Sequence, residues 1–161
     1  EPFDPRRFKG VNVPATGVRV AQQSPDRPRT ASVRITQPSH LWQLREMRAL
    51  RDAEQEHNYA IGLDSSGVVL VVHLAAVGTV DRAQSHTRDV FRALIRCNCT
   101  RFIFVHNHPG GPREPSESDR DVTRWLATTG EWLGIPLDAH LLIAGDGDPV
   151  VVDGGTHAPN P

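Results

Sequence analysis

Two histidines and one aspartate are the residues of this sequence best spaced to bind a metal ion. His106 and His108 follow an apolar run, residues 102–105, and Asp119 lies eleven residues after His108, beyond a loop rich in Gly and Pro. Side chains at i and i+2 of a strand point to the same face, so both imidazoles can reach one ion. We expect Asp119 in the first turn of the next helix, folded back over the strand end by the loop.

Two imidazoles and one carboxylate are three protein ligands, a number typical of catalytic zinc sites. Such sites leave a fourth tetrahedral position for water, whereas structural zinc sites fill all four positions with protein ligands. Zinc lowers the pKa of this water from about 15.7 to about 7, which makes hydroxide available at neutral pH. The ligand types and their spacing therefore predict metal-assisted hydrolysis.

Hydrolysis also needs a proton acceptor beside the water and a hydrogen-bond donor to the developing oxyanion. Ser116, three residues before Asp119, can supply the donor. The same Ser-x-x-Asp spacing fits an N-terminal helix cap, in which the hydroxyl accepts from the third backbone N–H of the helix. The two roles are compatible. The base should be a carboxylate from another element.

The strands that must position these residues are expected to form a mixed sheet. Two β-rich runs, 59–63 and 68–72, flank an Asp-Ser-Ser-Gly turn and predict a hairpin. The apolar run at 102–105 is typical of a central strand buried on both faces. Strands at 137–144 and 149–152 complete the set, and the whole predicts one α/β domain with a central sheet flanked by helices.

Three helices are expected around the sheet. Serines are the expected N-caps and Asn or Gly the expected stops: Ser39 for a first helix of roughly four turns, Ser85 and Asn98 for the second, Ser116 and Gly130 or Gly134 for the third. The residues expected to face inward are Leu41, Leu44, Met47 and Leu50, then Val90, Phe91, Ala93, Leu94 and Cys97, then Val122, Trp125, Leu126 and Leu133. We expect Trp42, Trp125 and Trp132 in the core.

The chain of 161 residues is expected to be one domain with two loosely structured ends. Residues 1–30 predict a Pro-rich, partly irregular arm, 31–152 the folded domain and 153–161 a flexible tail. The 18 basic and 19 acidic side chains nearly cancel, so no global charge excess points to nucleic acid. No apolar run reaches the roughly 18 residues of a membrane span, so we expect no membrane partner. Cys97 and Cys99 are too close for an ordinary disulfide and fit a reducing, cytosolic setting.

The spacing of the metal-binding residues resembles that of a known family. His106-x-His108-Pro109, then six residues, Ser116, two residues and Asp119 is similar to the signature of the JAMM (MPN+) metalloproteases. Within that superfamily the chain resembles the bacterial RadC-like branch over about residues 33–152. The supporting stretches are His106-Asn107-His108-Pro109, Gly111, Pro115-Ser116, Gly78-Thr79, Arg88-Asp89-Val90-Phe91 and Leu137-Asp138-x-His140.

This resemblance implies a JAB/MPN domain of cytidine-deaminase-like architecture, with zinc held by His106, His108 and Asp119. It also implies a glutamate base that enters the site just before an early strand. The matching position is Glu56, and Glu54 is the competing candidate. His140 is interpreted as a buried hydrogen-bonding residue near the zinc rather than a further ligand, and Asn107 as a structural hydrogen-bonder.

Three functions fit these observations. The first is a zinc hydrolase that cleaves a peptide or isopeptide bond of a protein substrate. The second is a RadC-like accessory protein of DNA repair or mobile elements that binds metal without proteolysis; its DNA contacts would come from the locally basic arm, through Arg6, Arg7, Lys9, Arg19, Arg27 and Arg29. The third is a catalytically silent interaction module, against which the complete ligand set argues.

Overall fold

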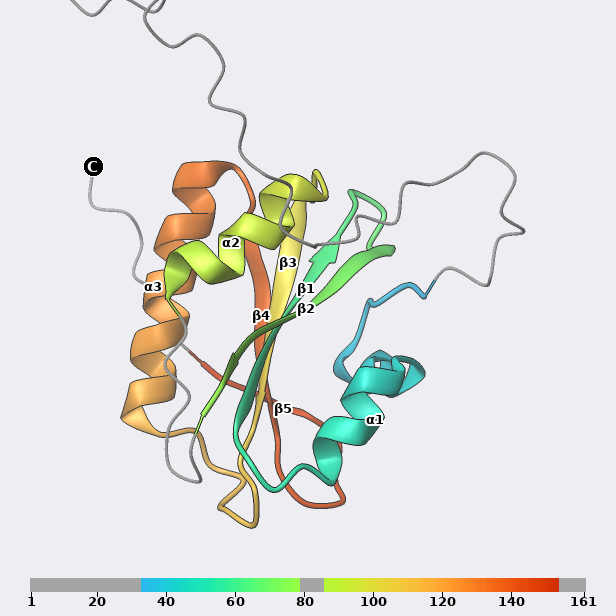
Figure 1. Ribbon diagram of the computed structural model, residues 1–161, viewed down its shortest axis with the longest axis vertical. Helices are drawn as coiled ribbons and strands as arrows, with labels where there is room; N and C mark the ends of the chain where they lie inside the picture. Colours follow the sequence, from blue (N-terminus) through green and yellow to red (C-terminus); the bar gives the residue numbers. More distant parts are fainter. Residues whose placement is uncertain (1–32, 79–85, 154–161) are drawn as a thin grey trace, which may run out of the picture.

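A twisted five-stranded sheet forms the centre of the computed structural model, which describes residues 33–78 and 86–153 (Figure 1). Its strand order is β2-β1-β3-β4-β5. The strands are β1 (His57–Leu63), β2 (Val69–Val77), β3 (Arg101–Asn107), β4 (Leu137–Ile143) and β5 (Val150–Val151). β3 and β4 are parallel and the other neighbours are antiparallel, so the predicted mixed sheet, the β1–β2 hairpin and the central place of β3 are confirmed.

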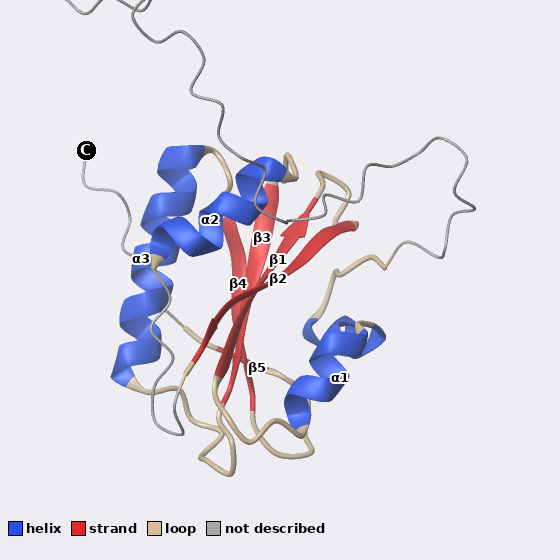
Figure 2. Ribbon diagram, in the orientation of Figure 1, coloured by secondary structure: helices blue, strands red, loops and turns tan. Residues whose placement is uncertain are grey.

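Helices cover both faces of the sheet, as Figure 2 shows. A 3-10 helix (Pro38–Gln43) and α1 (Arg45–Arg51) pack on one face, and α2 (Thr87–Arg96) and α3 (Glu117–Leu133) pack on the other. Along β3, Ile103 and Val105 join the core under α1, whereas Phe102 and Phe104 join the core under α2 and α3. Because side chains alternate along a strand, His106 faces the α3 side of the sheet.

The first helix differs from its prediction. Leu44 is extended (φ −85°, ψ 129°) and divides the segment into the 3-10 helix and α1, and Ser39 lies inside the 3-10 helix rather than capping it. The apolar residues at 41, 44, 47 and 50 are nevertheless all buried. A strict three-residue spacing drifts by about 60° per step around an ideal α-helix. The break at Leu44 lets all four side chains reach the sheet.

The buried stripe of α3 agrees with its prediction only at Leu126. Its buried residues are Thr123, Leu126 and Gly130, while Trp125 and Trp132 are 70% and 88% exposed. Gly130 lies close to the sheet and to the turn that follows the helix: a Cβ added there would lie 3.3 Å from Cε1 of Phe102 on β3 and 2.5 Å from the backbone oxygen of Ile135. Val122 and Leu133, which were also expected to be buried, are 37% and 46% exposed.

The remaining helix ends agree better with prediction. The inward residues of α2 are buried as expected except Cys97, which is half-buried at the C-cap. Asn98 follows with φ 52°, and Gly134 ends α3 with φ 68°, so both stops are confirmed. His86 is the N-cap of α2, and the predicted cap Ser85 lies outside the described residues.

Several expectations concern parts of the chain that the structure does not describe. The predicted arm and nearly all of the predicted tail fall in residues 1–32 and 154–161, so both stay predictions. In the described part of the chain, no helix combines the length and the apolar character needed to cross a membrane.

Candidate metal centre

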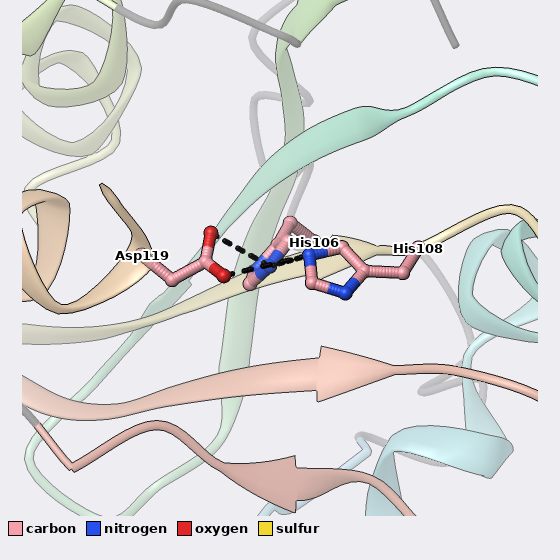
Figure 3. Close-up of side chains that lie close together, drawn as sticks. All are labelled: His106, His108 and Asp119. Atoms are coloured by element: carbon pink, nitrogen blue, oxygen red, sulfur yellow. Dashed lines mark hydrogen bonds and ion pairs between the residues drawn. The ribbon is translucent and has the colours of Figure 1, made fainter. Parts of the chain in front are cut away.

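His106, His108 and Asp119 converge at one end of the sheet (Figure 3). His106 Nε2 lies 3.2 Å from Asp119 Oδ1, and His108 Nε2 lies 3.4 Å from Asp119 Oδ2. The two Nε2 atoms are 3.2 Å apart. One ligand atom from each residue lies within 4.8 Å of the others, so the cluster could hold a metal ion. The side chains of His106, His108 and Asp119 are only 2%, 17% and 13% exposed.

Ser116 and Asp119 form a reciprocal cap that sets the direction of α3. The Ser116 hydroxyl accepts a hydrogen bond from the Asp119 backbone N–H (3.1 Å), and Asp119 Oδ2 accepts from the Ser116 backbone N–H (2.7 Å). The predicted helix cap is therefore confirmed. Asp119 Oδ2 also accepts from the Ser116 hydroxyl at 2.7 Å. These bonds occupy Oδ2 and leave Oδ1, beside His106, as the carboxylate oxygen better placed to bind a metal.

Hydrogen bonds made by Pro112 and Arg113 hold the middle of the loop between β3 and α3. The carbonyl of Pro112 lies 3.1 Å from His108 Nδ1. A carbonyl can only accept, so Nδ1 carries the proton and the neutral ring presents a bare Nε2 to the cluster. Arg113 donates to the backbone oxygens of Ala144 and Asp148 at 3.3 and 2.9 Å. Gly147 leaves room for this contact, since a Cβ there would overlap the guanidinium.

The cluster is electrostatically coupled. Burial by itself raises the pKa of Asp119, but its close contacts with His106, His108 and Ser116 outweigh burial and hold the pKa well below its ordinary value. The hydrogen bond to Asp119 is also the main reason that the pKa of His108 is raised, and the negative charge of Glu56 contributes. Asp119 is thus an anion across the physiological range and favours a cation beside it.

Glu56 lies immediately before β1 and is half-buried. The antiparallel register pairs Asn58 with His106. Continued by two residues, this register places Glu56 opposite His108, and side chains at opposed positions share one face of the sheet. The effect of the Glu56 charge on His108 agrees with this placement. Glu54 is exposed and borders a pocket next to His108 on the α1 side.

Asn107 lies between the two histidines and points to the opposite face. Its Oδ1 accepts from the His57 backbone N–H at 2.8 Å, and its Nδ2 donates to the Gln55 carbonyl at 3.0 Å. The structural role predicted for Asn107 is confirmed. These two bonds hold the residues on either side of Glu56, whose own carbonyl accepts from Gly78 N at 2.8 Å.

His140 is 2% exposed on β4 and lies next to the cluster, as predicted for a buried hydrogen-bonding residue. Its Nε2 is 2.7 Å from His106 Nδ1, and its Nδ1 is 2.7 Å from Thr123 Oγ1. Burial lowers the pKa of His140 well below its ordinary value, and the nearby His106 adds to the effect. Thr123 was missed from the sequence. Its position four residues after Asp119, on the same face of α3, is the signal that points to it.

The fold and the cluster together define an α/β domain with a candidate metal site at the end of its central strand. The RadC-like JAB domain family matches residues 35–152, and the chain belongs to this family.

Curated relatives are consistent with this family. The chain is 36% identical to a UPF0758 protein of Methanospirillum hungatei over 110 residues, which are 68% of this chain and 49% of the relative. It is 43% identical to a UPF0758 protein of Thermotoga maritima over 91 residues (56% and 41%), and 35% identical to one of Staphylococcus haemolyticus over 111 residues (69% and 48%). The chain thus spans about half the length of these relatives, or less.

Proposed function

We propose that this domain is a zinc-dependent hydrolase that cleaves a peptide or isopeptide bond. The observation that carries the proposal is the convergence of two histidine nitrogens and a largely buried carboxylate to within 4.8 Å. When bound, zinc supplies a Lewis acid that lowers the pKa of water to about 7. Three protein ligands leave one position of a tetrahedral site for that water, as in other zinc hydrolases.

The spacing of the donor atoms fits zinc. Zinc binds imidazole nitrogen and carboxylate oxygen at about 2.0–2.2 Å, and a tetrahedral arrangement at that distance separates neighbouring ligand atoms by roughly 3.3–3.6 Å. The separations of His106 Nε2 from His108 Nε2 and from Asp119 Oδ1 are both 3.2 Å. These two separations therefore lie within a few tenths of an ångström of those in a tetrahedral zinc site.

Glu56 is the proposed general base. Its carboxylate accepts a proton from the attacking water and later passes that proton to the leaving amine. Support comes from its register opposite His108, from its half-buried position and from the bonds that hold its neighbours. Glu54, exposed on the α1 side, has none of these features and is the weaker candidate.

Ser116 is the proposed oxyanion donor. Its hydroxyl proton is directed to Asp119 Oδ2 at 2.7 Å in this structure. Donation to a substrate requires that the hydroxyl turn away from this oxygen, while the Ser116 backbone N–H keeps its bond to the carboxylate. A thiol mechanism is not supported, because burial raises the pKa of Cys99 to about 12 and keeps this thiol protonated.

The test combines metal analysis with a cleavage screen. Purified protein is analysed for bound metals, reconstituted with Zn²⁺ and screened against peptides and isopeptide-linked conjugates. Glu56→Gln should bind Zn²⁺ like the wild type but lose at least about 100-fold in turnover, the scale of general acid–base catalysis. Glu54→Gln is the matched control and should keep activity. Full activity in Glu56→Gln, or loss only in Glu54→Gln, would refute the assignment of the base.

An accessory role in DNA repair or in mobile elements, without proteolysis, remains the second candidate. It is favoured by membership of the RadC-like family and by the six basic residues within positions 1–30. DNA binding that weakens with salt and disappears when residues 1–30 are deleted would support it. We place either activity in a reducing, cytosolic setting, consistent with the free thiols of Cys97 and Cys99.

A further inference from the structure

An unbroken chain of hydrogen bonds links two of the candidate ligands through residues that do not bind the metal. It starts at His106 on β3 and passes to His140 on β4 and then to Thr123 on α3, with 2.7 Å at each step. It ends where the Thr123 hydroxyl meets the backbone carbonyl of Asp119, again at 2.7 Å. This series of hydrogen bonds therefore joins three elements of the fold and ends at Asp119, which carries the third candidate ligand.

The chemistry of the last bond sets the direction of the whole chain. A threonine hydroxyl has one proton, and the Asp119 carbonyl can only accept it. Thr123 Oγ1 must then accept at its other contact, so His140 carries a proton on Nδ1. In a neutral His140 ring Nε2 is bare, and it accepts from His106 Nδ1. His106 is left with an unprotonated Nε2, the nitrogen that faces His108 and Asp119.

The same direction follows from the opposite end of the chain. A neutral imidazole that binds a metal through Nε2 must hold its proton on Nδ1, and that proton needs an acceptor. His140 Nε2 is at 2.7 Å and is the partner of His106 Nδ1 in the structure. If Thr123 were an apolar residue, the buried His140 could instead carry its proton on Nε2 and donate it to His106. The proton of His106 would then sit on Nε2, where it blocks a metal.

We propose that His140 and Thr123 are positioning residues that preset His106 for metal binding, by holding its proton on Nδ1 and by tying its ring to the first turn of α3. This proposal rests on the metal site proposed above. The competing explanation is that these hydrogen bonds only provide partners for buried polar groups and have no effect on metal binding. Thr123 alone would support that view, because threonines in helices commonly donate to the carbonyl four residues earlier.

The same helix offers a matched control for this common bond. Thr129 Oγ1, on α3, donates to the Trp125 carbonyl at 2.9 Å in a solvent-exposed hydrogen bond. Thr123→Val and Thr129→Val each remove one hydroxyl with nearly the same shape. Only Thr123→Val removes the acceptor of His140. Thr123→Ser keeps a hydroxyl at the critical position.

The first measurement is Zn²⁺ affinity, by competition with a chromophoric chelator. Thr123→Val should bind Zn²⁺ roughly 10- to 100-fold more weakly than the wild type, the usual cost of removing a hydrogen-bond partner behind a metal ligand. Thr129→Val should match the wild type, and Thr123→Ser should recover most of the lost affinity. Equal affinity in Thr123→Val and Thr129→Val, or an equal loss in Thr123→Ser and Thr123→Val, would overturn the proposal.

The second measurement needs no variant of His140 or Thr123. Two-bond ¹⁵N–¹H correlation spectra of the metal-free wild-type chain at alkaline pH report which nitrogen of each histidine is protonated. His106 and His140 should both carry the proton on Nδ1, and a proton on Nε2 of either ring would overturn the proposal. This result stands apart from the proposed hydrolysis: a protein that binds zinc and shows these tautomers but cleaves no substrate would refute the hydrolase and keep the positioning role of His140 and Thr123.

Discussion

The side chain of Asn107 accepts a hydrogen bond from the backbone N–H of His57, with 2.8 Å between Oδ1 and N. This contact joins the end of β3, where the candidate ligands lie, to the start of β1, where the candidate base lies. Its partner bond from Asn107 Nδ2 to the Gln55 carbonyl holds the other side of Glu56. The histidines and the glutamate are thus connected through one buried amide.

Replacement of Asn107 should therefore impair both stability and activity. Asn107→Ala leaves the His57 N–H and the Gln55 carbonyl without this partner and should cost about 1–3 kcal/mol of unfolding free energy. We also expect turnover to fall while zinc content stays near the wild-type value, because Asn107 holds the glutamate and not the metal. Chemical denaturation, metal analysis and the cleavage assay measure the three quantities. Unchanged turnover in a folded Asn107→Ala protein would contradict the link to Glu56.

Ser116→Ala separates the two roles of this serine. Loss of the cap should lower the unfolding free energy by about 0.5–2 kcal/mol. Loss of the proposed oxyanion donor should in addition lower turnover by roughly 10²- to 10³-fold with little change in substrate binding. Ser116→Asp is a useful comparison, since aspartate caps a helix but cannot donate as an anion. If Ser116→Ala loses stability alone, the serine is only a cap.

The metal-free protein should become less stable as pH rises through neutrality. The pKa of His108 is raised above its ordinary value of about 6.5, chiefly by its hydrogen bond with Asp119. A base whose pKa is raised by folding contributes stability that is complete below its unfolded pKa and is lost as pH rises through the folded pKa. The thermal midpoint in chelator should therefore fall from about pH 6.5 upward. His108→Asn should lack this step.

Acid should also destabilise the metal-free protein, because folding lowers the pKa of Asp119. The pKa of Asp119 is lowered, so its contribution to stability is present above the unfolded pKa and is lost as pH falls below about 4.

Added Zn²⁺ should stabilise the protein more strongly as pH rises, because metal binding requires unprotonated imidazoles. Thermal melts with chelator and with Zn²⁺ across this pH range test both trends. If the thermal midpoint in chelator increases as pH rises above about 6.5, the predicted ion pair between His108 and Asp119 is contradicted.

Two substitutions in α3 test which of its faces packs on the sheet. Leu126 is 3% exposed, and Leu126→Ala should cost about 2–5 kcal/mol. Trp132 is 88% exposed, and Trp132→Ala should change stability by no more than about 0.5 kcal/mol. Denaturation of the two variants measures both values. A large loss in Trp132→Ala would mean that this tryptophan is covered in solution.

The residues of the candidate centre could be predicted because their arrangement depends on local rules. Alternation along a strand places His106 and His108 on one face, and the Ser116–Asp119 spacing alone predicts the cap that the structure contains. The hairpin and the central strand were likewise predictable from short apolar runs and a turn. These features need only a few consecutive residues to take their preferred conformation.

Only the tertiary structure decided which distant residues lie beside the candidate metal ligands. The position of Glu56 depends on the register between β1 and β3, and the contacts of His140 depend on the pairing of β4 and the docking of α3. Most of the buried face of α3 also escaped prediction, because periodicity favours large apolar residues such as Leu126, whereas the structure also buries Thr123 and the small Gly130. Sequence by itself determined which local groups can bind a metal. Long-range pairing and close packing determined which residues hold and orient them, because these depend on segments that are far apart in the chain.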